Sequence, residues 1–211
     1  MRNRYSSMAS DTILDAALGG APHVRILRYL CRAGGEHTGR AISRAVHISH
    51  PAVHRALRTL AGREIVQAVR HGPAISYQLN EEHWLVRTGI RPLFDAESTF
   101  FTAVGEAVRK AAGVPVRSVI VFGSVARGDA GAESDIDLLC LTVRADGGAK
   151  ADRNLTEGAV ALRHQFGRRL SVLVLPAAEF VRRYRRKERL VREAVETGWV
   201  VAGEPLSEVL G

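Results

Sequence analysis

The chain has 211 residues, of which 46% are hydrophobic and 25% charged, a composition typical of a globular protein of one or two domains. No apolar run approaches the roughly 18 residues of a membrane-spanning helix, so no membrane partner is expected. The formal net charge of +8 favours a polyanionic partner, although an arginine-rich protein from a GC-rich genome carries the same charge without one.

The N-terminus and the cysteines indicate the compartment. Residues 1–10 lack the apolar core of a secretory signal and are predicted to be a flexible tail. Cys31 and Cys140 fall within apolar patterns in separate segments, which predicts two buried, reduced thiols. Both observations favour a cytoplasmic protein.

Residues 11–90 begin with helical patterns. Apolar residues recur at helical spacing over 13–18 and 24–31. Thr38 is a suitable N-cap for a short helix over 39–45, because its hydroxyl can accept a hydrogen bond from a free N–H of the first turn. We therefore expect the first part of this region to be helical.

A further helix and a hairpin complete the region. Ser49 is predicted to cap a helix that ends near Leu60 and whose core-facing residues recur at i, i+3, i+4 and i+7. Short strands over 65–69 and 75–79 flank a basic turn, which predicts a β-hairpin.

The order helix, short helix, turn, capped helix, hairpin is that of a winged helix-turn-helix. With Thr38-Gly39-Arg40, Ser49–Leu60 and Tyr77-Gln78-Leu79-Asn80, the stretch resembles the winged helix domains of bacterial and archaeal transcriptional regulators. The resemblance implies that the capped helix enters the major groove of double-stranded DNA, while the wing touches backbone or minor groove. A winged helix used for protein contacts or dimerisation remains the alternative.

The resemblance also implies which side chains contact DNA. On the basic outward face of the capped helix, the implied DNA-binding residues are His54, Arg55 and Arg58. Those implied to lie nearer the phosphates are Arg40, Arg44 and Arg70. We expect binding as a homodimer.

A helix is predicted to join two domains over residues 91–115. It follows Arg91-Pro92 and carries apolar residues at roughly helical spacing. Phe100 and Phe101 within it are compatible with a dimer interface and with core packing.

Two predicted strands bring phosphate-binding and metal-binding residue types together. An apolar run over 118–122 predicts a buried strand that stops at Gly123 and Ser124. The next strand carries Asp135 and Asp137, which point to one face because side chains alternate along a strand. Neighbouring carboxylates repel unless a cation lies between them, and Mg²⁺ takes its other ligands from water and phosphates. Glycine permits close approach of a phosphate and serine offers a hydroxyl, so a nucleoside triphosphate site is predicted.

These residues resemble the motif of nucleotidyltransferases of the DNA polymerase β type in their minimal form, with Gly123-Ser124, Ala126-Arg127-Gly128 and Ser134-Asp135-Ile136-Asp137 in order. The resemblance implies that Asp135 and Asp137 are catalytic and hold Mg²⁺ or Mn²⁺. The ligand or substrate it implies is ATP or another NTP. The implied nucleotide-binding residues are Gly123, Ser124 and Arg127, the last neutralising developing charge.

The remaining pattern completes a small α/β domain with a mixed sheet. Helices are predicted over 151–166 and 177–198, and strands over 169–175 and 199–201. The fold class is therefore α+β, an N-terminal winged helix-turn-helix plus a C-terminal nucleotidyltransferase-like α/β domain. The predicted parts are a tail at 1–10, a winged helix domain at 11–90, a linker helix at 91–115 and the nucleotidyltransferase-like domain at 116–211.

The third strand of this domain departs from the family pattern. Active members place a third carboxylate there, which helps to bind the metal and accepts the proton of the attacking hydroxyl. The aligned residue here is Ser171, whose hydroxyl is a poor metal ligand and no base at neutral pH. Asp129 and Glu133, in the loop before the two aspartates, are alternative ligands.

Two main functions remain open at this stage. The first is a transcriptional regulator that binds DNA and uses a nucleotide as ligand. The second is an enzyme that transfers NMP from NTP to a hydroxyl of a protein such as a HEPN-type toxin partner, of a tRNA or of a small molecule. A third is a protein-interaction module that has lost both activities. The basic run over 182–187 is compatible with phosphate, RNA or DNA contact and with a solvated helix face.

Overall fold

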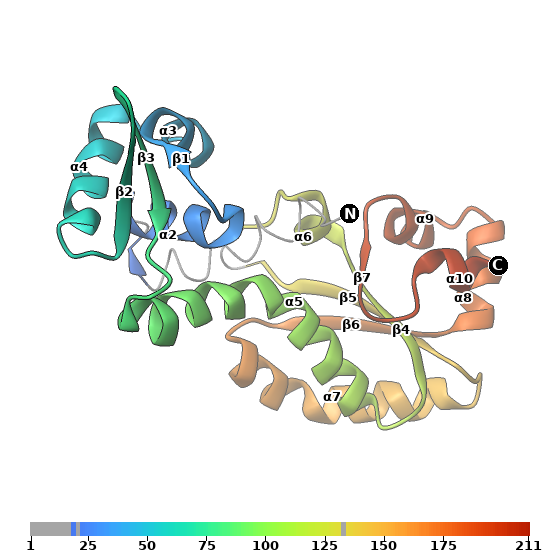
Figure 1. The fold of residues 1–211 in the computed structure, drawn as a ribbon. Helices are drawn as coiled ribbons and strands as arrows, with labels where there is room; N and C mark the ends of the chain where they lie inside the picture. The colour runs from blue at the N-terminus through green and yellow to red at the C-terminus, as the bar shows by residue number, and fades with distance from the viewer. Residues whose placement is uncertain (1–17, 20–21, 132–133) are drawn as a thin grey trace. The chain divides into compact units, whose positions relative to one another are not determined.

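A computed structural model describes residues 18–19, 22–131 and 134–211 (Figure 1). The helix predicted over 13–18 therefore lies almost entirely outside the described residues. The chain divides into two compact units, one of which extends to Ser98 while the other continues from Thr99. Helix α5 (Arg91–Ala112) contributes residues to both units.

The first unit has the architecture of a winged helix. Its elements are α2 (Pro22–Ala33), β1 (His37–Thr38), α3 (Gly39–Val46), α4 (His50–Ala61), β2 (Val66–His71), β3 (Ala74–Leu79) and a π-helical turn, η1 (Val86–Ile90). Strand β3 lies between β1 and β2 and pairs antiparallel with both. The β2–β3 hairpin is the wing.

The helix ends of the helix-turn-helix follow local sequence chemistry. The N–H of Ala41 donates a hydrogen bond to Thr38 Oγ1 at 3.2 Å, so Thr38 caps α3 as expected. His47 ends α3 in the left-handed region, with φ +53°. Ser49 occupies the N-cap position of α4, but its side chain makes no capping hydrogen bond, and Pro51 lies in the first turn.

The core of the first unit is mainly apolar and contains a buried ion pair. The largest of its fully buried side chains are Ile26, Leu30, Ile42, Val53, Leu57 and Val66. Arg28 Nε of α2 donates to Glu97 Oε2 of α5 at 2.8 Å, and the Glu97 side chain is 2% exposed. A buried carboxylate needs such a partner, because an unpaired charge in the interior is strongly unfavourable.

The second unit is an α/β domain. Its elements after α5 are β4 (Val116–Phe122), α6 (Gly123–Arg127), β5 (Ile136–Thr142), α7 (Gly147–Phe166), β6 (Leu170–Pro176), α8 (Ala177–Arg185), α9 (Arg189–Glu196), β7 (Trp199–Gly203) and α10 (Leu206–Leu210). The sheet order is β6-β5-β4-β7. Strands β5 and β6 are parallel, whereas β4 pairs antiparallel with β5 and β7, so the sheet is mixed as predicted.

Apolar clusters cover both faces of this sheet. Ile136 and Leu138 of β5 pack on the face covered by α5 and α7, and Leu139 and Leu141 pack on the face covered by α8, α9 and α10 (Figure 1). Asp137 has the same strand parity as Leu139, so its side chain belongs to the α8–α9 face.

The single helix predicted over 177–198 is instead two helices. The interruption is at 186–188, where Lys187 adopts the left-handed conformation with φ +58°. Neither glycine nor proline marks this break, so the apolar periodicity alone gave no sign of it.

The aromatic pair of α5 serves the core. Phe101 is buried and packs edge-on against Trp199, with ring centroids 5.7 Å apart, while Phe100 packs edge-on against Phe166. Of the two uses considered for this pair, the described contacts are those of core packing. No described helix, α5 included, combines the length and the apolar character needed to cross a membrane.

Candidate functional site

The turn at Gly123 brings the end of β4 against a carboxylate of β5. Gly123 has φ +70°, and a Cβ placed on it would lie 2.4 Å from Asp137 Oδ2. Phe122, the last residue of β4, is the cross-strand partner of Asp137. A side chain at position 123 is therefore unfavourable, because it would strain the backbone and displace Asp137.

Asp137 lies opposite Ser171 in the parallel β5–β6 pair. Burial raises the pKa of the Asp137 carboxyl above its ordinary value, and the negative charge of Asp135 adds to this effect. A hydrogen bond from Ser171 acts in the opposite direction. Smaller contributions come from Glu193, which raises the pKa, and from Arg127, which lowers it. Burial is therefore the main cause of the raised pKa of Asp137, and the neighbouring acids add to it.

Asp135 immediately precedes β5 and is more exposed. Its Oδ2 lies 3.7 Å from Arg169 Nε, and its side chain is 41% exposed. The mutual effect of Asp135 and Asp137 is the one that a divalent cation between two carboxylates would relieve, so the oxygen donors fit Mg²⁺ or Mn²⁺. Over residues 22–131 and 134–211, no three histidine, cysteine or acidic side chains gather closely enough to hold a metal ion.

Of the two alternative ligands in the loop, the structure describes only Asp129. Glu133 lies outside the described residues. Asp129 Oδ2 accepts a hydrogen bond from Arg127 Nε at 3.2 Å, and Arg127 Nη1 also pairs with Glu193 Oε1 of α9. Arg127 is thus joined to two acids within the site.

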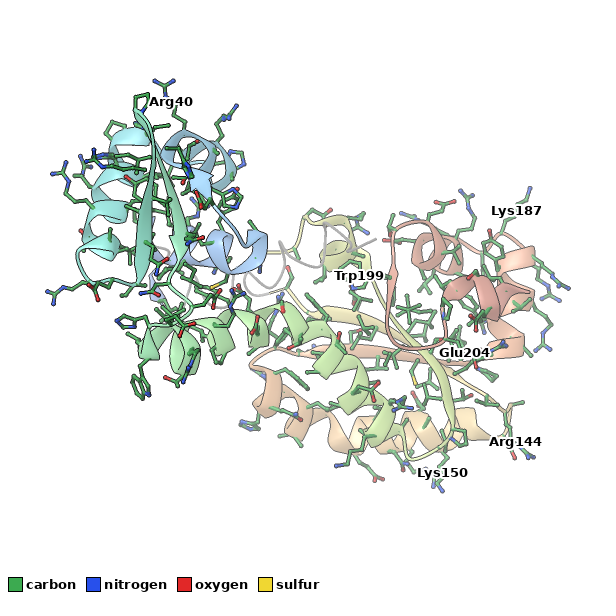
Figure 2. All side chains as sticks on the ribbon, in the orientation of Figure 1. Arg40, Arg144, Lys150, Lys187, Trp199 and Glu204 are labelled. Carbon is green, nitrogen blue, oxygen red and sulfur yellow. The ribbon has the colours of Figure 1, made fainter. Side chains whose placement is uncertain are left out.

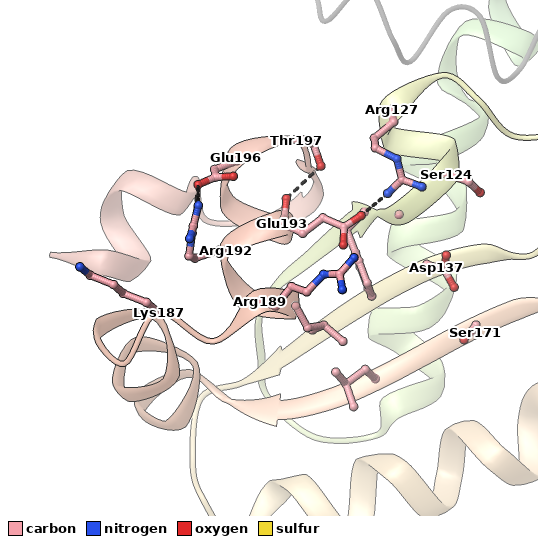
Figure 3. Close-up of a pocket in the computed structure, with 14 residues that line it drawn as sticks. Ser124, Arg127, Asp137, Ser171, Lys187, Arg189, Arg192, Glu193, Glu196 and Thr197 are labelled. Atoms are coloured by element: carbon pink, nitrogen blue, oxygen red, sulfur yellow. Dashed lines mark hydrogen bonds and ion pairs between the residues drawn. The ribbon is translucent and has the colours of Figure 1, made fainter.

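An open cleft of about 930 Å³ connects these groups (Figure 3). The motif residues that line it include Gly123, Ser124, Arg127 and Asp137, together with Ser171, whereas Asp135 is not among them. The opposite wall comes from the α8–α9 turn and from α9, with Lys187, Arg189, Arg192, Glu193 and Glu196. The structure therefore brings the predicted phosphate-binding residues and one of the two aspartates to a single cleft.

Sequence reasoning missed the α9 wall. Arg189, Arg192, Glu193 and Glu196 follow an i, i+3, i+4, i+7 spacing, which places them on one polar face of a helix. That spacing was visible in the sequence, but the direction in which the face turns depends on the packing of Val191 and Ala194.

The six residues predicted to contact DNA are all exposed on the first unit. They are Arg40, Arg44, His54, Arg55, Arg58 and Arg70, on α3, α4 and β2. Within the described part of this unit none of the five arginines has an ion-pair partner. Arg40 and His54 line one shallow hollow together with Pro73 of the wing turn, and Figure 2 shows Arg40 at the periphery of the unit.

Family comparisons agree with this division. Residues 18–73 match the MarR family, and residues 104–196 match the nucleotidyltransferase domain family. The first match extends from before α2 through the wing turn, and the second from within α5 to the end of α9. No curated protein and no solved structure matches the chain. The chain thus joins a MarR-family winged helix domain to a nucleotidyltransferase domain.

Proposed function

We propose that this protein is a transcriptional regulator that binds double-stranded DNA as a homodimer through its MarR-family domain and binds ATP or another NTP, with Mg²⁺, as a ligand in its nucleotidyltransferase domain. In this proposal the nucleotidyl-transfer activity of the second domain is weakened or lost. A cytoplasmic location is part of the proposal and is supported by two free, buried thiols, Cys31 and Cys140.

One observation carries the loss of transfer activity. Ser171 occupies the position of β6 that lies across from Asp137, where the resemblance calls for a third carboxylate. A hydroxyl does not accept a proton at neutral pH, and general-base assistance typically contributes about 10²- to 10⁴-fold to a rate. A domain without that base is better suited to holding a nucleotide than to turning it over.

The retained residues support nucleotide binding. Asp135 and Asp137 would hold the divalent cation, which when bound supplies charge neutralisation and orientation to the phosphates. Gly123 leaves room for a phosphate to approach the backbone, and the Ser124 hydroxyl lines the cleft beside it. Arg127 lines the same cleft, where it is paired with Glu193 and Asp129.

The basic surface of the first unit supports DNA binding. Exposed arginines without ion-pair partners in the described unit are available to phosphates, and α4 offers Arg55 and Arg58 on its outward face. A nucleotide changes DNA affinity only if it binds one state of the protein better than another, so the proposal requires coupling between the two sites.

The DNA-binding half is tested by selecting DNA from a random-sequence pool with the full chain. The affinity for the selected duplex is then measured by fluorescence anisotropy, with and without Mg²⁺ and ATP. We expect sequence-specific binding that Mg-ATP alters in the wild type but not in Asp137→Asn. Failure to select any sequence would contradict the regulator, and an Mg-ATP effect that persists in Asp137→Asn would contradict the site.

A second candidate function is nucleotidyl transfer to a hydroxyl of a protein, a tRNA or a small molecule. One observation favours it, namely that Glu193 places a carboxylate in the same cleft as Asp137. Its negative charge acts on Asp137, although it is now paired with Arg127. Labelled NTP, Mg²⁺ or Mn²⁺ and candidate acceptors distinguish the two functions. Transfer that disappears in both Asp137→Ala and Glu193→Gln would replace the ligand function with the enzymatic one.

A further inference from the structure

The four cations that line the cleft are not equivalent. Arg127 is paired with Glu193 and Asp129, and Arg192 Nη2 lies 3.0 Å from Glu196 Oε1. The side chains of Lys187 and Arg189 have no hydrogen-bond or ion-pair partner within the described part of the chain. Two of the four positive charges are therefore compensated inside the protein.

Of the two uncompensated cations, Arg189 is the one that reaches inward. Figure 3 shows its guanidinium extending from the start of α9 toward the side of the cleft that holds Asp137 and Ser171. Lys187, on the left-handed turn before α9, points to the outer rim in the same view. Arg189 is thus an exposed, unpaired guanidinium in the same cleft as the candidate metal-binding carboxylate.

We propose that Arg189, rather than Arg127, is the principal cation that binds the terminal phosphates of the nucleotide in this cleft. The inference deepens the proposed function and rests on it for the identity of the ligand. A guanidinium donates two parallel hydrogen bonds to a phosphate, and Arg189 has its donors free. At Arg127 an incoming phosphate meets the negative charges of Glu193 and Asp129 together with the positive one.

Arg189 also differs from the arginines of the basic run over 182–187. Arg182 and Arg183 pair with Glu179, so they are engaged within α8. Arg186 is exposed but does not line the cleft, whereas Arg189, just beyond the left-handed turn, does. The turn at Lys187 separates α8, where Arg182 and Arg183 pair with Glu179, from Arg189, which lines the cleft.

The experiment is isothermal titration of the full chain with ATP, AMP and inorganic tripolyphosphate, each with Mg²⁺. We expect Arg189→Gln to weaken ATP and tripolyphosphate binding about tenfold or more while AMP binding changes about twofold or less. Arg189→Lys keeps the positive charge but loses the paired N–H donors of the guanidinium, so its affinity for ATP should lie between those of the wild type and Arg189→Gln. Arg127→Gln should lose less affinity for ATP than Arg189→Gln does, and Arg186→Gln should match the wild type.

The outcomes separate this inference from the proposed function. Unchanged ATP and tripolyphosphate affinity in Arg189→Gln, or a larger loss in Arg127→Gln, would overturn the assignment to Arg189 while leaving nucleotide binding intact. Tripolyphosphate binding that needs Arg189, without any binding of ATP, would support the anion site and overturn the nucleotide ligand. A wild-type protein that binds neither would overturn both. Thermal unfolding of each variant checks the fold, which removal of the unpaired, exposed side chain of Arg189 or of Arg186 should leave unchanged.

Discussion

Asp137 and Ser171 lie side by side on the parallel strands β5 and β6, and a hydrogen bond from Ser171 stabilises the ionised form of Asp137. In this arrangement the serine supports a carboxylate that is already present and supplies no carboxylate of its own. This pair is the basis of the proposal that the domain holds a nucleotide rather than transferring it.

Restoring an acid at this position should restore chemistry. We expect Ser171→Asp to raise the rate of label transfer from NTP, in the presence of Mg²⁺, by about 10²-fold or more, the usual contribution of a general base. Ser171→Asn is the control, because asparagine has the size of aspartate but no charge, and its rate of label transfer should remain at the wild-type level. Equal rates for both variants would show that the missing base is not what limits transfer.

The close approach at Gly123 predicts a specific structural cost. Gly123→Ala places a Cβ against Asp137 Oδ2 in a backbone conformation with positive φ, so we expect the free energy of unfolding to fall by about 1–3 kcal/mol. Gly158→Ala, within α7 where no atom lies within 4 Å of the added Cβ, should instead stabilise the protein by about 0.5–1 kcal/mol. Urea denaturation measures both changes, and a neutral Gly123→Ala would contradict the described turn.

The wing of the first unit carries a pH-dependent contact. Hydrogen bonds from Ser76 and from His71 to Glu36 lower the pKa of the Glu36 carboxyl below its ordinary value of 4.5. A carboxyl with a lowered pKa in the folded state contributes stability that is present above pH 4.5 and is lost as the pH falls through the folded-state pKa. We therefore expect the stability difference between wild type and Glu36→Gln to shrink below pH 4.5, as measured by unfolding curves across that range.

A difference that stays constant with pH would show that the Glu36 contacts do not form in solution. The carboxyl carbon resonance of Glu36 gives the same pKa directly by NMR titration, independently of unfolding.

The DNA-binding assignment predicts a change in salt dependence. Arg55→Ala and Arg58→Ala should each weaken binding to the selected duplex, and each lost phosphate contact should reduce the slope of log affinity against log salt by about 1. If the side chain reads a base instead, discrimination at one position should fall by about 1–3 kcal/mol. Arg25→Ala is the matched control, because Arg25 is an exposed arginine of α2, outside the predicted recognition helix. Unchanged binding in both α4 variants would remove α4 as the recognition helix.

The elements that bear local signals were predictable from the sequence. Thr38 and the glycine-serine turn have local chemistry that fixes a helix start and a strand end. The alternation of side chains along β5 also predicted the face of the sheet on which Asp137 lies, and Leu139 lies on the same face. Ser171 could be aligned with the position of the third carboxylate because it is the single polar residue in the apolar part of the third strand.

The contacts that were missed join residues far apart in the chain. Arg127 and Glu193 are 66 residues apart, and Arg28 and Glu97 are 69 apart, so neither pair leaves a periodic trace in the sequence. The break at Lys187 was missed because a left-handed residue other than glycine has no compositional marker. Each of these features depends on tertiary packing, which residue spacing does not report.

The most direct test of the central claim is equilibrium dialysis of labelled ATP against the full chain, with Mg²⁺ or with EDTA, for wild type and Asp137→Asn. We expect stoichiometric, Mg²⁺-dependent binding to the wild type, with the ATP recovered unconsumed, and a loss of binding in Asp137→Asn. Absence of binding to the wild type, or equal binding by Asp137→Asn, would contradict the assignment of this cleft as a nucleotide site.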